Sequence, residues 1–174
     1  CPLTEAEPLI GEPHKLFWIP DAEGVDVDER RDLIGARITP KRILFRVTAG
    51  PSHGSGHIRR CLALADELSH HKIVFAPGGH RSELAPWVPE MVEEHGFPWD
   101  RLHDRWPELV VFDSLDTSIA DVCGYRTPGV PVVTLEDLGP GSDHANLVIN
   151  ELYADARPHV LAGPKYSVLR PEFC

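Results

Sequence analysis

Residues 43–65 read ILFRVTAGPSHGSGHIRRCLALA. The first five, residues 43–47, are apolar, β-branched or aromatic side chains with one arginine, a composition that predicts a strand. A loop rich in glycine and serine follows over residues 49–56, and apolar side chains then recur at positions 58, 61, 62, 65 and 68. That spacing marks one face of an amphipathic helix. The stretch therefore predicts a strand, a glycine loop and a helix in direct succession.

The chain continues this alternation toward its C-terminal end. We expect a second helix around residues 84–92, and further strands over residues 72–76, 109–112, 130–135 and 146–149. Strands that alternate with helices form parallel sheets with helices on both faces. The predicted fold class is therefore α/β, with a Rossmann-like, mainly parallel, doubly wound sheet.

Residues 1–40 differ in character, because they carry prolines at positions 2, 8, 13, 20 and 40 among many acidic residues. They hold one strand candidate over residues 16–19 and one short polar helix candidate over residues 29–36. We therefore expect two parts. A tail with its linker occupies residues 1–40, and a Rossmann-like domain occupies residues 41–174.

The composition limits the partners of this protein. Its 174 residues include 27 acidic and 17 basic side chains, so the net charge is −10, which argues against nonspecific binding to nucleic acid or anionic membranes. No apolar run approaches the roughly 20 residues of a membrane-spanning helix. The cysteines at positions 1, 61, 123 and 174 form no C-x-x-C pair, so we expect no zinc or redox motif and a reducing, cytoplasmic setting. We predict no metal and no cofactor.

The glycine loop is the segment that most strongly indicates a ligand. Gly54 and Gly56 allow sharp turns and close approach of the backbone, and the N–H groups at a helix start suit a phosphate. His57 lies in the first turn of the expected helix, where it can point into a crevice and exchange protons near neutral pH. The dinucleotide fingerprint is absent, because Arg59 stands where its third glycine belongs, and the Walker lysine is absent too. The alternative is a glycine turn with a helix-capping histidine.

Polar residues stand where the expected strands end. Asp113 follows the apolar run at residues 109–112, Glu136 and Asp137 follow the next strand, and Asn150 follows the last. Doubly wound sheets bind ligands outside the carboxyl ends of their strands. We therefore expect these residues to lie on the same edge as the glycine loop.

Several separated segments together resemble the UDP-sugar hydrolase family of pseudaminic acid biosynthesis, which cleaves UDP-2,4-diacetamido-2,4,6-trideoxy-β-L-altropyranose. The matching segments are residues 43–47, 54–65, 110–113, 135–138, 146–150 and 163–173. Their order and spacing agree with those of the family over roughly residues 42–173. The family resembles the two-domain GT-B glycosyltransferases. The resemblance implies that residues 41–174 form the N-terminal half of such a fold and that a C-terminal domain, which carries most of the uridine-binding residues, lies outside this chain. It also implies hydrolysis at the anomeric carbon with release of UDP.

The resemblance implies roles for individual residues. His57 matches the motif histidine that activates or orients the attacking water, and Gly54 and Gly56 let the backbone approach the diphosphate. Arg60 matches the motif arginine, which contacts the substrate or forms a salt bridge within the domain. The acidic pair after the strand either binds sugar hydroxyls and takes part in acid–base chemistry or caps its own loop. The expected substrate-binding set is Gly54, Ser55, Gly56, Arg60, Asp113, Glu136, Asp137 and Asn150.

Two departures from the family pattern bear on the sugar that is recognised and on activity. Thr48 stands where the family commonly has aspartate, and Leu115 stands where it often has tyrosine. Two other functions therefore remain open. One is a GT-B glycosyltransferase with a UDP-sugar donor, and the other is a non-catalytic sugar-nucleotide-binding remnant. In either catalytic case, we expect the 174-residue piece to be inactive without the C-terminal domain.

The tail carries a shorter resemblance of its own. Residues 15–19 and 24–33 resemble the C-terminal end of acylneuraminate cytidylyltransferases. This implies a parent protein in which a CMP-sugar-forming domain is fused to the hydrolase. Asp26 and Asp28 match an acidic segment that helps to hold a metal in that family, but the remainder of such a site is missing here, so we assign no metal to them.

Overall fold

The computed structural model describes residues 39–78, 84–99, 107–126 and 128–168. The chain divides into two compact units, residues 1–39 and 40–174, and the fold described below belongs to the second. The strand candidate at residues 16–19, the helix candidate at residues 29–36 and the segments of the tail resemblance lie outside the described residues.

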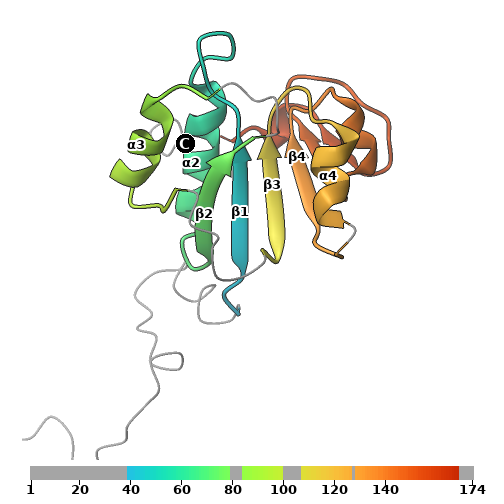
Figure 1. Ribbon diagram of the computed structural model, residues 1–174. Coiled ribbons are helices and arrows are strands. Elements are labelled where there is room, and N and C mark those ends of the chain that lie inside the picture. The colour runs from blue at the N-terminus through green and yellow to red at the C-terminus, as the bar shows by residue number, and fades with distance from the viewer. Residues whose placement is uncertain (1–38, 79–83, 100–106, 127, 169–174) are drawn as a thin grey trace, which may run out of the picture. The chain divides into compact units, whose positions relative to one another are not determined.

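The described part of the chain is built on a six-stranded sheet in which every neighbouring pair of strands is parallel (Figure 1). The order across the sheet is β2-β1-β3-β4-β5-β6. This arrangement confirms the predicted α/β fold class. The strands are β1 (Arg42–Val47), β2 (Lys72–Pro77), β3 (Leu109–Asp113), β4 (Val132–Leu135), β5 (Leu147–Asn150) and β6 (Val160–Ala162).

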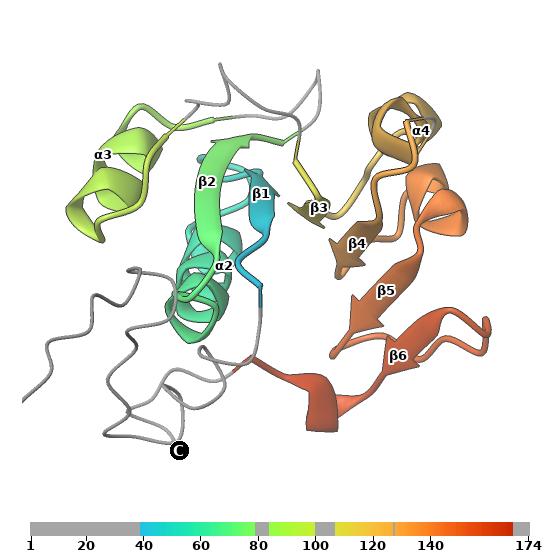
Figure 2. The ribbon, with the colours of Figure 1, turned by 90° about the horizontal axis from the view of Figure 1, so that it is seen from below.

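Helices cover both faces of this sheet. Helix α2 and helix α4 lie on opposite sides of it in Figure 2. The chain turns from β1 outward to β2 and then returns to place β3 on the other side of β1, so the strand order reverses between β1 and β3. Such a switch point is where doubly wound sheets open a ligand crevice. The helical segments are α2 (Gly56–Glu67), α3 (Trp87–Glu94), α4 (Ile119–Arg126), η1 (Pro140–His144) and η2 (Pro164–Tyr166).

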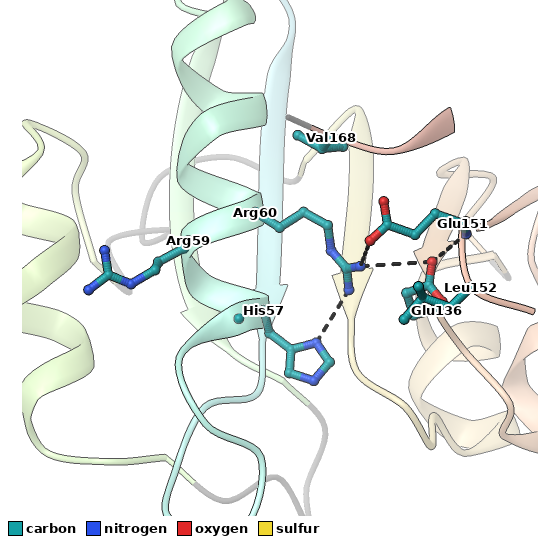
Figure 3. Close-up of a pocket in the computed structure, with 8 residues that line it drawn as sticks. His57, Arg59, Arg60, Glu136, Glu151, Leu152 and Val168 are labelled. Carbon is teal, nitrogen blue, oxygen red and sulfur yellow. Dashed lines mark hydrogen bonds and ion pairs between the residues drawn. The ribbon is translucent and has the colours of Figure 1, made fainter. Parts of the chain in front are cut away.

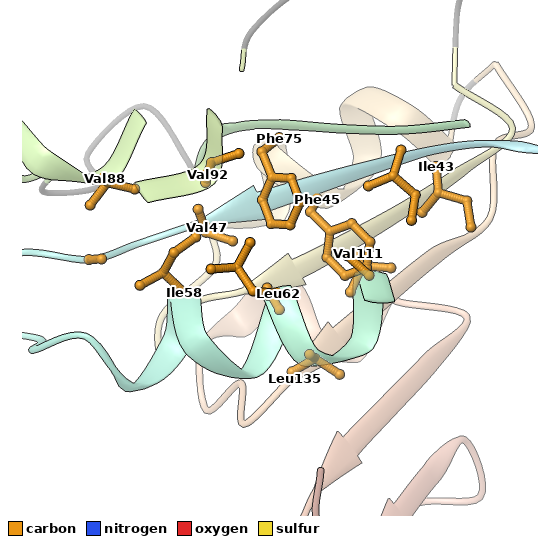
Figure 4. Packing of buried hydrophobic residues seen from close by; sticks show 14 of the residues in the cluster. Ile43, Phe45, Val47, Ile58, Leu62, Phe75, Val88, Val92, Val111 and Leu135 are labelled. Carbon is orange, nitrogen blue, oxygen red and sulfur yellow. The ribbon is translucent and has the colours of Figure 1, made fainter. Parts of the chain in front are cut away.

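Two apolar clusters hold the helices on the sheet, one on each face. Phe45 and Phe75 stack with ring centroids 5.0 Å apart on the face that α2 and α3 cover (Figure 4). Leu44, next to Phe45 on β1, points to the other face and packs in the cluster that includes Val122 of α4. Because successive strand residues face opposite sides, both neighbours are fully buried only where both faces are covered. This explains why the central strands read as continuous apolar runs.

Helix α4 and strand β6 are elements that the hydrophobic pattern does not predict. Val122 is the buried residue of α4, so the helix has no apolar stripe. Its start is nevertheless encoded locally, because the Ser118 hydroxyl accepts the Asp121 N–H at 3.1 Å and the Asp121 carboxylate accepts the Ser118 N–H at 3.1 Å. This is a capping box, and its Ser-x-x-Asp spacing is visible in the sequence. The second predicted helix begins later than expected, at Trp87, with Pro86 in the N-cap position.

Within the described residues, the helices are too short or too polar for any of them to span a lipid bilayer.

Candidate active site at the carboxyl edge of the sheet

The predicted site residues lie at the carboxyl ends of the parallel strands, which is the placement that the sequence predicts. Asp113 is the last residue of β3, Asn150 is the last of β5, and Glu136 and Asp137 follow β4 directly. All four side chains are buried. The glycine loop leaves the same edge after β1 and leads into α2.

The glycine loop makes a tight turn before the helix starts. Gly54 has a φ of 69°, a conformation that glycine adopts without strain, and its N–H donates to the Gly50 carbonyl at 2.7 Å. Ser55 is the N-cap of α2 but its side chain makes no capping hydrogen bond. The first N–H groups of α2 therefore lack a side-chain cap, and the positive end of the helix dipole remains available to an anion.

His57 is held by Asp113. Side chains alternate along β3, so Asp113 points to the same face as Val111, and that face is covered by α2. The His57 Nδ1 atom lies 2.5 Å from Asp113 Oδ1. Arg60 Nη2 lies 3.4 Å from the same nitrogen, but two N–H donors do not bond, so we assign the Nδ1 proton to the Asp113 contact. No described residue bonds Nε2, which carries the free lone pair on the opposite edge of the ring.

Arg60 and Cys61 bind the same carboxylate from the next turn of α2. Arg60 forms a two-point pair with Asp113, with Nε to Oδ2 at 2.9 Å and Nη2 to Oδ1 at 2.6 Å, and the Cys61 thiol donates to Oδ2 at 3.4 Å. Burial alone would lower the pKa of Arg60, but the hydrogen bonds and charge of Asp113 outweigh it and raise the pKa. Burial raises the pKa of the Cys61 thiol, so it stays neutral and able to donate. Of the two roles expected for Arg60, the structure shows the salt bridge within the domain.

Two glutamates complete the surroundings of Arg60. Its Nη1 atom lies 3.4 Å from Glu151 Oε1 and 3.8 Å from Glu136 Oε1. The Glu151 backbone N–H donates to Glu136 Oε1, whereas Glu136 Oε2 is buried without a partner. With Asp113, three carboxylates surround one guanidinium, so this side of the site carries an excess of negative charge.

Arg60, Glu136 and Glu151 line an open pocket of about 370 Å³, which His57 also lines (Figure 3). Its volume lies within the range of small-ligand sites. Arg59 points away from Arg60 on the other side of α2. Four of the pocket's lining residues are not among the predicted site residues, although the position of Glu151 directly after a strand is a usable signal, and they are Arg59, Glu151, Leu152 and Val168. The lining residues are Gly56, His57, Arg59, Arg60, Glu136, Glu151, Leu152 and Val168.

Asp137 lies next to Glu136 but does not line this pocket. Its Oδ1 accepts the Thr117 N–H at 3.1 Å and the Gly139 N–H at 2.9 Å, and its Oδ2 accepts the Thr117 hydroxyl. Burial raises the pKa of this carboxyl. Asp137 therefore ties its own loop to the segment that leads into α4. This is the loop-capping role that the sequence offered as the alternative to sugar binding, so Asp137 is not part of the proposed site.

Thr48 and Asn150 are also buried beside the edge without lining the pocket. Thr48 donates its backbone N–H to the Asp113 carbonyl at 3.1 Å, so it stands directly beside the catalytic candidates. The Thr48 hydroxyl and the Asn150 amide oxygen have no partner among the described residues. Leu115, which stands where the resembling family often has tyrosine, is half-buried, and its carbonyl accepts the Leu138 N–H at 3.0 Å.

Comparison with known proteins found no protein-family model and no curated protein that matches the chain. The chemistry of the site therefore rests on its own geometry. That geometry offers an imidazole with a free Nε2, a buried carboxylate that orients it, and an uncapped helix start at one pocket. Among the described residues, no three or more His, Cys, Asp or Glu side chains gather in a way that would hold a metal ion.

Proposed function

We propose that this chain forms the N-terminal half of a GT-B-type sugar-nucleotide hydrolase that releases UDP and a free sugar from a UDP-linked diacetamido-trideoxy-hexose. The observation that carries the proposal is the hydrogen bond between His57 and the buried Asp113 at the N-terminal end of α2. This pairing leaves Nε2 as an acceptor on a residue that lines an open pocket. The family resemblance described above supplies the substrate class.

In the proposed reaction, a water oxygen attacks the anomeric carbon of the sugar. The bond between that carbon and the oxygen of the β-phosphate breaks, and its electron pair leaves with UDP. The proton of the water passes to His57 Nε2. Asp113 stabilises the imidazolium that forms, while its two-point pair with Arg60 holds the carboxylate in place. A positioned general base of this kind contributes about 10²- to 10⁴-fold to the rate.

The diphosphate is proposed to lie against the start of α2. The uncapped N–H groups and the helix dipole both favour an anion there, and Gly56 lines the pocket without a side chain that would fill it. Arg60 is committed to three carboxylates, so we assign it no phosphate contact. The uridine is proposed to bind the C-terminal domain that the resemblance implies, because closure of two domains excludes water other than the reacting molecule.

The test is an assay of the full-length polypeptide with the UDP-sugar and no acceptor, in which UDP and free sugar are measured together. We expect both products in equal amounts. We expect His57→Ala to lower kcat by about 10²- to 10⁴-fold while its circular dichroism spectrum stays that of the folded protein. His95→Ala is the control, because His95 is an exposed histidine at the end of α3 that does not line the pocket.

Each contrary outcome has a definite meaning. Turnover of His57→Ala near the wild-type rate removes the role assigned to His57. Product formation that depends strictly on an added acceptor identifies a glycosyltransferase instead. Binding of the UDP-sugar without any turnover identifies a non-catalytic binding protein.

A further inference from the structure

Glu136 has two features that the folding of the domain does not explain. Its φ is 53°, and it is the one described residue other than glycine with a positive φ. Its side chain is buried, with the residue 3% exposed, yet the Oε2 atom has no hydrogen-bond partner. Both features cost folding free energy, and such costs concentrate at functional sites. The Oε2 atom is therefore a candidate hydrogen-bond acceptor for a ligand.

The contacts of Glu136 define what kind of group that is. Its Oε1 atom is occupied by the Glu151 N–H, so Oε2 is the acceptor that remains. Glu136 lines the same pocket as His57, on the side where carboxylates outnumber the single guanidinium (Figure 3). Like charge repels a diphosphate from this side. A neutral part of the ligand that donates a hydrogen bond fits it.

An apolar hollow adjoins Glu136. A second pocket, of about 140 Å³, shares Arg60, Glu136, Glu151 and Val168 with the first and is otherwise walled by uncharged side chains. Helix α2 provides Leu64, strands β4 and β5 provide Leu135 and Ile149, and η2 provides Tyr166. A hydrogen-bond acceptor beside an apolar hollow matches a group in which an N–H lies next to a methyl. On a sugar, that group is an acetamido substituent.

We propose that Glu136 is a specificity-determining residue whose Oε2 accepts the acetamido N–H of the sugar while the acetyl methyl enters the apolar hollow. The sugar then lies on the Glu136 side of His57, and the diphosphate lies on the side of the α2 start. This inference deepens the proposed function and rests on it for the sugar-nucleotide ligand. It concerns binding alone, so its test does not depend on turnover.

Glu136→Gln is the informative substitution because of the Glu151 N–H. That donor requires an oxygen at the Oε1 position, so the Gln amide turns its NH₂ toward the ligand and replaces an acceptor by a donor. An acetamido N–H donates only, and it faces another donor in the variant. A sugar hydroxyl both donates and accepts, so it adapts to the change. The substitution therefore penalises an acetamido sugar selectively.

The experiment measures equilibrium binding of UDP-N-acetylglucosamine and UDP-glucose to the full-length polypeptide by calorimetry. We expect the wild type to prefer UDP-N-acetylglucosamine by about fourfold, the usual effect of burying one methyl-sized group, because a glucose hydroxyl also donates to Oε2 but places no methyl in the apolar hollow. Glu136→Gln removes that preference and leaves UDP-glucose binding nearly unchanged. Glu151→Gln removes the same charge from the same pocket but keeps the Glu151 N–H, so the preference persists. In saturation-transfer NMR, the acetyl methyl of the bound wild-type ligand receives strong saturation.

A second variant keeps the proposal testable if Glu136→Gln fails to fold. Leu64→Phe enlarges a side chain that lines the apolar hollow but not the larger pocket, so it also removes the preference. The proposal is overturned if the wild type binds both nucleotides equally, if UDP-N-acetylglucosamine does not bind, or if the preference survives both substitutions. If the wild type prefers UDP-N-acetylglucosamine and the substitutions remove that preference, but the protein does not hydrolyse the UDP-sugar, this inference stands and the proposed function is refuted. If the protein hydrolyses the UDP-sugar but shows no such binding preference, the proposed function stands and this inference is refuted.

Discussion

Replacement of Asp113 by asparagine is the perturbation that tests the core of the site most directly. The Asp113 carboxylate is wholly buried and receives His57 Nδ1 at 2.5 Å, Arg60 Nε at 2.9 Å, Arg60 Nη2 at 2.6 Å and the Cys61 thiol at 3.4 Å. Asparagine has the same shape but one oxygen. If that oxygen keeps His57 and Nη2, the new NH₂ faces Arg60 Nε and the thiol, both of which are donors.

The expected loss of stability follows from these contacts. One charge-assisted hydrogen bond contributes about 1.5–3 kcal/mol, and breaking a buried ion pair costs about 3–5 kcal/mol. Glu136 and Glu151 remain near Arg60 and offset part of this loss. We therefore expect Asp113→Asn to lower the free energy of unfolding by about 3 kcal/mol.

Urea unfolding of the 174-residue chain, followed by circular dichroism, measures this loss. With a slope of about 2 kcal/mol per molar urea, the midpoint falls by about 1.5 M. Asp66→Asn is the control, because Asp66 is exposed on the same helix and its substitution is expected to change stability by less than about 0.5 kcal/mol. A midpoint for Asp113→Asn that matches the control refutes the idea that this carboxylate organises the site.

Three further predictions concern the loops that support this edge. Ser118→Ala removes the capping box of α4 and is expected to cost about 1 kcal/mol in the same urea experiment; no change contradicts a capping role. Gly141→Ala is expected to cost about 1–3 kcal/mol, because its Cβ would lie 2.2 Å from the Thr117 hydroxyl, whereas Gly124→Ala in α4 meets open space and is expected to be neutral or stabilising. Burial raises the pKa of Asp137, so the folded state holds its proton more tightly and wild-type stability falls as the pH rises through that range. Since asparagine does not titrate, the stability deficit of Asp137→Asn is expected to shrink as the pH rises above the ordinary aspartate pKa of 3.8 in urea titrations, and a constant deficit argues against the raised pKa.

Most of the fold is predictable from the sequence because its signals are local. The apolar runs of the central strands, the glycine loop and the apolar face of α2 each lie within a few residues and indicate their own element. Alternation of these elements is enough to predict a parallel, doubly wound sheet. Helix α4 and strand β6 are the exceptions. Helix α4 has one buried residue and therefore no periodicity, so only its capping box marks it, and β6 is three residues long without a buried side chain.

The side chains of the site are brought together by contacts between residues far apart in the sequence, which no local sequence pattern encodes. Asp113 lies 56 residues from His57 and 53 from Arg60, and Glu151 lies 91 from Arg60. They meet because β3 lies beside β1, β4 and β5 continue the sheet on the same side, and α2 covers one face of these strands.

The sequence by itself determined which polar residues end the strands, because strand ends are local features. Only the tertiary structure decided what each of them does. Glu136 and Asp137 look alike in sequence, yet the positive φ at Glu136 leaves one carboxylate in the pocket and the other bound to Thr117 and Gly139. The direction of a side chain at a turn depends on backbone angles and on distant partners, and composition specifies neither.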